Sequence, residues 1–204
     1  MKKYFLLILG LVLTGATTHA VAVAPEYTFV SAGYSKFSSK IDGFSEVPEG
    51  KGISLKLSYA VRPYIALTAG YNTGSADVTT SGTTIDADIK STTLGILVHL
   101  PVNDTADFIL AVAFINGNAE VYKNGAFSSN VDADGGVTTI GVRAMISEKL
   151  ELNGFIHRNT IEDASKFSLS FATAYYVTES VSVDLGYLFD GDSDSLVFAV
   201  TKYF

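Results

Sequence analysis

A two-residue alternation of side-chain character runs through most of this 204-residue chain. Apolar residues occupy every second position from Ile53 to Val61, and Ser, Lys or Ala stand between them. Because successive side chains of a β-strand point to opposite faces, this period predicts strands with one apolar face. It predicts nine strands, over residues 53–61, 65–72, 91–100, 108–114, 138–146, 150–157, 167–175, 181–189 and 196–200. A tenth strand, with mixed faces, is expected over residues 27–37.

The composition limits how such strands can be covered. Hydrophobic residues make up 48% of the chain and charged residues only 17%, yet no apolar run after the first 20 residues approaches the length of a membrane-spanning helix. A closed barrel is the other structure that satisfies every backbone group in lipid, so we expect an all-β, closed, antiparallel transmembrane barrel of ten strands, with eight as the alternative. The chain has no Cys, which excludes disulfides and thiolate metal sites. Its net charge of -7 argues against a nucleic-acid partner.

The first 20 residues have the pattern of an export signal. Lys2 and Lys3 precede an apolar run over residues 4–13, and a small-residue stretch ends at Ala20. The apolar run is too short to cross a bilayer as a helix, although an uncleaved anchor is the alternative. We therefore expect residues 1–20 to be a cleaved signal peptide and residues 21–204 to form one outer-membrane barrel domain.

The polar faces of the predicted strands indicate which side is inside. They carry mostly Ser, Thr, Gly and Ala, whereas the outer face of a water-soluble, lipocalin-like barrel, the main alternative, should carry more Lys and Glu. Small polar side chains with few charges are expected in a narrow lumen, where charges must be paired. A polar network in the lumen is expected from the inward-facing ionisable residues, and Arg143 should pair with Glu151 or Asp184. The expected members are Lys56, Arg143, Glu151, His157 and Asp184.

The connections alternate in length. Short turns are expected at residues 62–63, 101–105, 147–149 and 178–180. Long loops are expected at residues 38–51, 74–89 and 119–136, with shorter ones on the same side at 160–166 and 190–195. This pattern is typical of outer-membrane barrels, with the turns and both chain ends at the periplasmic side. The outward loops are acidic, so bridging divalent cations could link them to lipopolysaccharide phosphates. The acidic residues are Asp42, Glu46, Glu49, Asp77, Asp86, Asp88, Asp132, Asp134, Glu162 and Asp163.

The export signal, the alternating strands, the segment Val30-Ser31-Ala32-Gly33-Tyr34 and the terminal Phe204 resemble small Gram-negative outer-membrane β-barrel proteins, including the attachment–invasion and OmpX-like group. The resemblance implies a place in the cell outer membrane. It also implies that the barrel-assembly machinery recognises the last strand through Phe198, Val200 and Phe204. The sequence departs from that group by having ten predicted strands instead of eight. Lys202 also stands where the group usually has an aromatic residue.

Two further clusters have candidate chemistry. A lipid-directed hydrolase could use His157 with Ser168 or Ser170 from a neighbouring strand, oriented by Glu162 or Asp163. The spacing favours a hydrogen-bonding role for His157 instead, so no residue is assigned to catalysis and no cofactor is expected.

The alternating carboxylates Asp190, Asp192 and Asp194 suit Ca²⁺, but the later Glu of a complete binding loop is missing, which favours a solvated turn. An earlier acidic stretch, residues 132–136, also has the composition of a turn.

The sequence therefore predicts a monomeric outer-membrane barrel with a narrow lumen filled by side chains. Its expected partners are outer-membrane lipid, lipopolysaccharide and the assembly machinery. A structural or surface-interaction role is expected, and a general diffusion pore is not. A narrow channel for small solutes or ions, and the hydrolase centred on His157, are the alternatives.

Overall fold

A computed structural model describes residues 27–40, 48–80, 82–161 and 164–204. The predicted signal peptide, with the proposed cut after Ala20, lies outside the described residues. Within the described ranges, no helix has the length and hydropathy needed to cross a membrane. The strands are β1 (Phe29–Ser39), β2 (Glu49–Arg62), β3 (Ile65–Thr80), β4 (Thr83–Asn103), β5 (Ala106–Lys123), β6 (Ala126–Ser147), β7 (Leu150–Ile161), β8 (Ala164–Thr178), β9 (Val181–Phe189) and β10 (Ser193–Tyr203).

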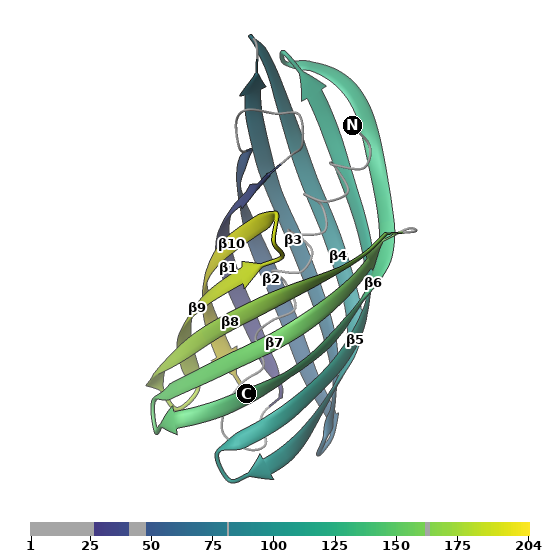
Figure 1. The fold of residues 1–204 in the computed structure, drawn as a ribbon. Helices are drawn as coiled ribbons and strands as arrows, with labels where there is room; N and C mark the ends of the chain where they lie inside the picture. Colours follow the sequence, from purple (N-terminus) through teal and green to yellow (C-terminus); the bar gives the residue numbers. More distant parts are fainter. Residues whose placement is uncertain (1–26, 41–47, 81, 162–163) are drawn as a thin grey trace.

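The ten strands form one closed antiparallel barrel (Figure 1). Each strand pairs with its neighbours in the sequence, and β1 closes the ring by pairing with β10 from Phe29 opposite Tyr203 to Ser39 opposite Ser193. Closure removes every free sheet edge around the wall, as lipid requires. The prediction of a closed, all-β, ten-stranded barrel is confirmed.

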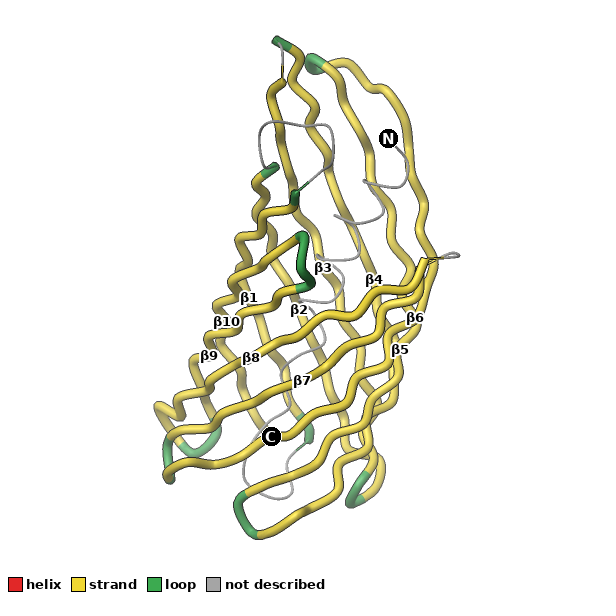
Figure 2. The backbone as a smooth tube through the Cα atoms, in the orientation of Figure 1, coloured by secondary structure: helices red, strands yellow, loops and turns green. Residues whose placement is uncertain are grey.

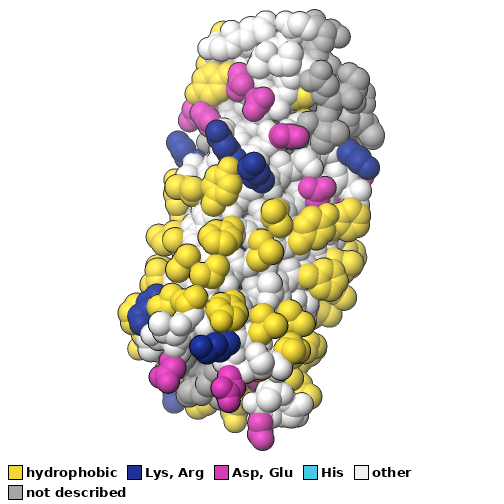
Figure 3. Space-filling model, turned by 90° about the vertical axis from the view of Figure 1, so that its left-hand side faces the viewer, with side chains coloured by type: hydrophobic (Ala, Val, Ile, Leu, Met, Phe, Trp, Pro, Cys, Tyr) yellow, Lys and Arg dark blue, Asp and Glu magenta, His cyan; other side chains and the backbone are white. Residues whose placement is uncertain are grey.

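The outer surface of the barrel carries an apolar belt (Figure 3). Ile53, Leu94 and Phe171, on three different strands, are each more than 60% exposed, whereas the polar side chains of the opposite faces are buried. A water-soluble barrel would have the reverse arrangement, since it hides its apolar face inside. The outward apolar face therefore excludes the soluble alternative and matches a barrel surrounded by lipid.

The prediction of long loops at residues 74–89 and 119–136 is wrong. Both segments are strand hairpins, in which only residues 81–82 and 124–125 separate β3 from β4 and β5 from β6. Their Ser, Thr, Asp and Gly content suggests loops, yet Val78, Ile85, Val121 and Val131 continue the strand pattern. Backbone pairing extends along both hairpins, with one register shift in the β5–β6 hairpin between Val121 and Tyr122. The predicted turn at residues 132–136 is also wrong, because these residues lie within β6. Strand lengths accordingly range from 9 to 22 residues.

The two hairpins pair with each other through β4 and β5, as far out as Ile85 opposite Lys123. They form a four-stranded hairpin extension, residues 78–80, 82–89 and 117–134, that rises beyond the β9–β10 hairpin (Figure 1). At the opposite end, the connections are two-residue turns such as Pro63-Tyr64 and Glu179-Ser180 (Figure 2). The barrel thus has a turn end and a hairpin end. Of the predicted β1–β2 loop, residues 41–47 lie outside the described ranges.

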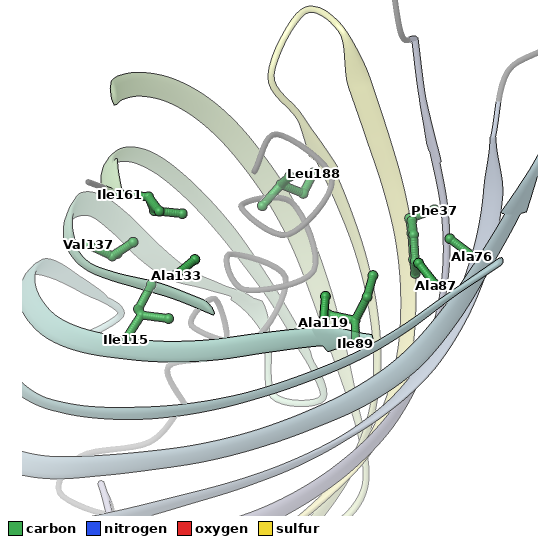
Figure 4. Close-up of a cluster of buried hydrophobic side chains, with 10 residues drawn as sticks. All are labelled: Phe37, Ala76, Ala87, Ile89, Ile115, Ala119, Ala133, Val137, Ile161 and Leu188. Carbon is green, nitrogen blue, oxygen red and sulfur yellow. The ribbon is translucent and has the colours of Figure 1, made fainter. Parts of the chain in front are cut away.

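Buried apolar side chains line the lumen towards the hairpin end (Figure 4). They come from β1, β3, β4, β5, β6, β7 and β9 and point inward from the wall. The members are Phe37, Ala76, Ala87, Ile89, Ile115, Ala119, Ala133, Val137, Ile161 and Leu188. Towards the turn end, buried polar and charged side chains share the lumen with two smaller apolar clusters, and this polar zone contains the candidate site.

Candidate functional site

The lumen is bridged near the turn end by Tyr27, which lies just before β1. Its hydroxyl donates to Asp107 Oδ2 on β5 at 2.6 Å and accepts from Arg143 Nη1 on β6 at 3.1 Å. Its ring stacks on His99 of β4 with 3.5 Å between ring centroids. Because β1 and β6 lie five strands apart in either direction round the ring, these contacts cross the barrel from one wall to the other.

Arg143 forms a buried ion pair with Glu151 on the neighbouring strand β7. Arg143 Nε lies 3.0 Å from Glu151 Oε2, and both side chains are almost entirely removed from solvent. The Tyr176 hydroxyl donates to the same carboxylate oxygen at 3.0 Å, and Asp107 lies 3.7 Å from Arg143 Nη1. Of the two partners expected for Arg143, Glu151 is the one that the structure brings into contact.

The residues that meet around this pair are called the Tyr27 layer. Arg143 lies beside two carboxylates, Glu151 and Asp107, and these opposite charges reduce the cost of burying the layer. The aromatic rings of the layer occupy space across the lumen. The members are Tyr27, His99, Asp107, Arg143, Glu151 and Tyr176.

Asp184 belongs to a second polar cluster, on β9 and β10. Ser182 donates to its Oδ1 at 2.6 Å and Thr201 to its Oδ2 at 2.5 Å. Lys56 on β2 is buried and is attracted by the Asp184 charge. A cavity of about 50 Å³ adjoins Lys56, large enough for only a few water molecules.

His157 is completely buried in the polar zone. One ring nitrogen, Nε2, lies 2.8 Å from Ser170 Oγ, and the other, Nδ1, lies 2.9 Å from Thr139 Oγ1. The structure therefore brings His157 to one of the two serines considered from the sequence, while Ser168 accepts from the Asn159 amide instead. A triad needs a carboxylate on the second nitrogen, and a threonine hydroxyl occupies that place.

Glu162 and Asp163, the carboxylates considered for orienting His157, lie outside the described residues. Ser170 is also buried, with 2% of its surface exposed. The arrangement fits a hydrogen-bonding network that joins β6, β7 and β8.

The three carboxylates of the β9–β10 connection do not converge on one point. Asp190 Oδ1 accepts from the backbone nitrogens of Asp192 and Ser193, which fixes the turn. Lys166 Nζ lies 3.1 Å from Asp190 and 3.0 Å from Asp192, and Ser38 donates to Asp194. Among the described residues no group of three or more His, Cys, Asp or Glu side chains is placed to hold a metal ion.

Six of the acidic residues predicted in loops lie on strands. Glu49, Asp77, Asp86, Asp88, Asp132 and Asp134 belong to β2, β3, β4 and β6, while Asp42, Glu46, Glu162 and Asp163 lie outside the described residues.

Several of the acidic groups on the hairpin extension are held by neighbouring side chains. Asn118 donates to Asp132 at 2.7 Å, and Asn116 donates to Asp134 at 2.6 Å. The Tyr122 hydroxyl donates to Glu120, and this hydrogen bond raises the pKa of Tyr122. The hairpin end thus presents an acidic, hydrogen-bonded surface.

The network predicted from the sequence included Arg143 and Glu151 but left out four members of the Tyr27 layer: Tyr27, His99, Asp107 and Tyr176. Asp107 lies two residues before Ile109, which points into the lumen from β5, so the two-residue period could have shown that Asp107 also points inward. Tyr27 carried no such signal, because it precedes β1 and its contacts depend on the closure of the whole ring.

The three residues considered for recognition during assembly lie on the outer face at the carboxy-terminal end of the barrel. Phe198 and Val200 are about half exposed, and Phe204 is 66% exposed. Lys202 Nζ lies 5.9 Å from the centre of the Phe204 ring and donates to Ser180 Oγ at 2.6 Å. Recognition of Phe198, Val200 and Phe204 by the assembly machinery stays a prediction.

Solved structures with the same architecture include two transport barrels of autotransporters. The transport unit of AIDA-I from Escherichia coli has a TM-score of 0.64 and 11% identity, covering 100% of this chain and 98% of that one. The translocator domain of NalP from Neisseria meningitidis has a TM-score of 0.56 and 10% identity, covering 99% and 95%. Ail, the attachment invasion locus protein of Yersinia pestis, has a TM-score of 0.43 and 13% identity, covering 88% and 98%. At these identities the first two matches show the fold alone.

No curated protein matches the chain closely in sequence. The model of one family, described as the outer membrane protein beta-barrel domain, matches residues 6–189, which is most of the chain. This match agrees with the closed ten-stranded ring and its lipid-facing apolar belt. The chain is therefore a β-barrel protein of the cell outer membrane and belongs to the outer membrane protein beta-barrel domain family.

Proposed function

We propose that this protein is a closed outer-membrane barrel with a structural or surface-interaction role, and that the Tyr27 layer blocks its lumen. The observation that carries the proposal is the contact of Tyr27 with β4, β5 and β6 across the ring. A ten-stranded barrel is narrow enough for inward side chains to occupy much of its cross-section. Diffusion of solutes through the turn end would require these buried, mutually bonded groups to separate.

The hairpin end is the surface through which the protein acts. Outer-membrane barrels have short turns on the periplasmic side and longer connections outside, so the hairpin extension faces the exterior and the turn end faces the periplasm. The extension carries hydrogen-bonded carboxylates at its surface. It provides contacts for lipopolysaccharide, through divalent cations, or for external partners. The barrel works as a monomer. It has no catalytic role in this proposal, and the burial of the His157–Ser170 pair supports that part of it.

Single-channel conductance in planar bilayers tests the closed lumen. The unmodified protein should show no stable open level. Tyr27→Ala should produce discrete conductance steps, because it removes the ring that spans the lumen, whereas Tyr27→Phe keeps the ring and should stay closed. Tyr59→Ala is the matched control, since Tyr59 is 63% exposed on the outer face.

A stable open channel in the unmodified protein would favour the narrow-channel alternative. A Tyr27→Ala variant that folds and stays silent would contradict the assignment of the block to the Tyr27 layer. Folding is checked independently, by the heat-dependent change in gel mobility of each variant.

A further inference from the structure

A surface groove lies on the outer face of the barrel, where β10, β1, β2 and β3 approach the hairpin end. Its volume is about 380 Å³. Tyr34 and Leu196 line it towards the apolar belt, Lys36 and Lys51 lie in its middle, and acidic residues line its outer part. The acidic residues are Glu49, Asp77 and Asp194.

The two lysines stand directly opposite each other on adjacent strands, since Lys36 is the register partner of Lys51. Like charges at directly opposed positions of an antiparallel pair repel, because their β-carbons are only about 5 Å apart. Neither lysine makes an ion pair within 4 Å with any residue of the described ranges. An anion between the two ammonium groups would relieve this repulsion.

The position of the lysines on the barrel indicates the source of that anion. On β1, Tyr34 belongs to the apolar belt, Lys36 follows two residues further out, and Ser38 donates to Asp194 beyond it. On β2, the order is Ile53, Lys51 and Glu49. On the face that Figure 3 presents, basic side chains lie above the apolar belt and acidic side chains lie above the basic ones. The lysines therefore lie at the level where the hydrocarbon layer ends and lipid headgroups begin.

We propose that this groove binds the phosphorylated headgroup of a membrane lipid, with Lys36 and Lys51 holding the phosphate and Tyr34 and Leu196 contacting its acyl chains. Two ammonium groups at headgroup level attract an anionic lipid, and the apolar lower part of the groove favours an amphiphile over a free ion. The inference rests on the proposed orientation, in which the hairpin end faces outward. The lipid in that leaflet is lipopolysaccharide, so lipid A is the occupant.

Native mass spectrometry of the full protein in a neutral detergent, titrated with diphosphoryl lipid A, tests the site. The unmodified protein should retain lipid A in preference to phosphatidylcholine. Lys36→Gln with Lys51→Gln should weaken retention about tenfold, because each lysine contributes a modest attraction to an anionic headgroup. Lys149→Gln at the turn end is the matched control and should bind like the unmodified protein.

Retention of lipid A by the double variant at the unmodified level would overturn the proposal, as would equal retention of phosphatidylcholine. Displacement of lipid A by an equal concentration of inorganic phosphate would show a free-anion site and overturn the assignment to a lipid. Both lysines are on the outer surface, so the double variant should fold, and its heat-dependent gel mobility checks this. The lumen plays no part in the measurement, so failure here would leave the conductance test of the closed barrel unaffected.

Discussion

Arg143 and Glu151 are opposite charges that the barrel holds 3.0 Å apart and almost entirely out of solvent. Removing one partner leaves the other buried without compensation, which costs about 3–5 kcal/mol. Arg143→Ala should therefore lower the urea concentration at which the barrel unfolds. The chain has no Trp, so circular dichroism or heat-dependent gel mobility serves as the readout.

The double variant Arg143→Ala with Glu151→Gln is the control, because it removes both charges. It should unfold at a higher urea concentration than Arg143→Ala alone. Equal unfolding midpoints for Arg143→Ala and the unmodified barrel would mean that the pair has no role in holding the Tyr27 layer together.

For single residues, the sequence predicted which side chains point into the lumen better than it predicted which side chains they contact. The two-residue period gave the inward direction of Lys56, Arg143 and Asp184 because it is a local property of each strand. It left Glu151 and Asp184 as equal candidates for Arg143. The choice depends on which wall each strand occupies after closure, and that information is spread over the whole chain.

Between β1 and β2, an aromatic ring packs against a glycine on the neighbouring strand. Phe37 lies opposite Gly50, and a β-carbon added to Gly50 would fall 2.1 Å from the Phe37 ring. Gly50→Ala should displace the ring and destabilise the barrel by about 1–3 kcal/mol. Urea unfolding of Gly50→Ala, Phe37→Ala and the double variant measures the coupling.

The double variant should be more stable than the sum of the single effects implies, because a shortened Phe37 no longer clashes. Gly154→Ala is the control, since its added β-carbon meets nothing closer than 3.8 Å. Strict additivity of Gly50→Ala and Phe37→Ala would contradict the contact.

The outward face of β9 provides a separate test of how the strands sit in lipid. Leu185 is 46% exposed on the belt, while its neighbour Asp184 is buried in the lumen. Leu185→Arg should cost about 2–4 kcal/mol of folding free energy in vesicles, because it places a charge in the hydrocarbon layer. Leu185→Met keeps the side chain apolar and should be close to neutral. Equal folding of the Arg and Met variants would place Leu185 away from lipid.

The strands also show where prediction from composition fails. Residues 74–89 and 119–136 have the Gly, Ser, Thr and Asp content of loops, yet they belong to the β3–β4 and β5–β6 hairpins. Thr and Val suit an extended pairing with a neighbouring strand, and each hairpin is paired to the next. The composition of a segment depends more on whether water or lipid surrounds it than on its backbone conformation. Strands that project beyond the membrane are surrounded by water, so their composition resembles that of loops.

As a whole molecule, the barrel joins residues far apart in the chain. The pairing of β1 with β10 brings Phe29 opposite Tyr203, and the Tyr27 layer then links the start of the barrel to β4, β5 and β6. Strand count and the direction of the faces followed from local patterns. A lumen filled by side chains was also predicted, but the part that Tyr27 plays in the proposed block was not, because its contacts with β4, β5 and β6 exist only once all ten strands have closed.

Photo-cross-linking from position 27 tests that block most directly. A photoreactive phenylalanine analogue in place of Tyr27 should form cross-links to β4, β5 and β6, in the peptides that contain His99, Asp107 and Arg143, as identified by mass spectrometry. The same analogue at Tyr59, on the outer face, should react with detergent or lipid instead. Cross-links from position 27 confined to β2 and β10, the strands beside β1, would show that Tyr27 does not reach the far wall and would contradict the closed lumen.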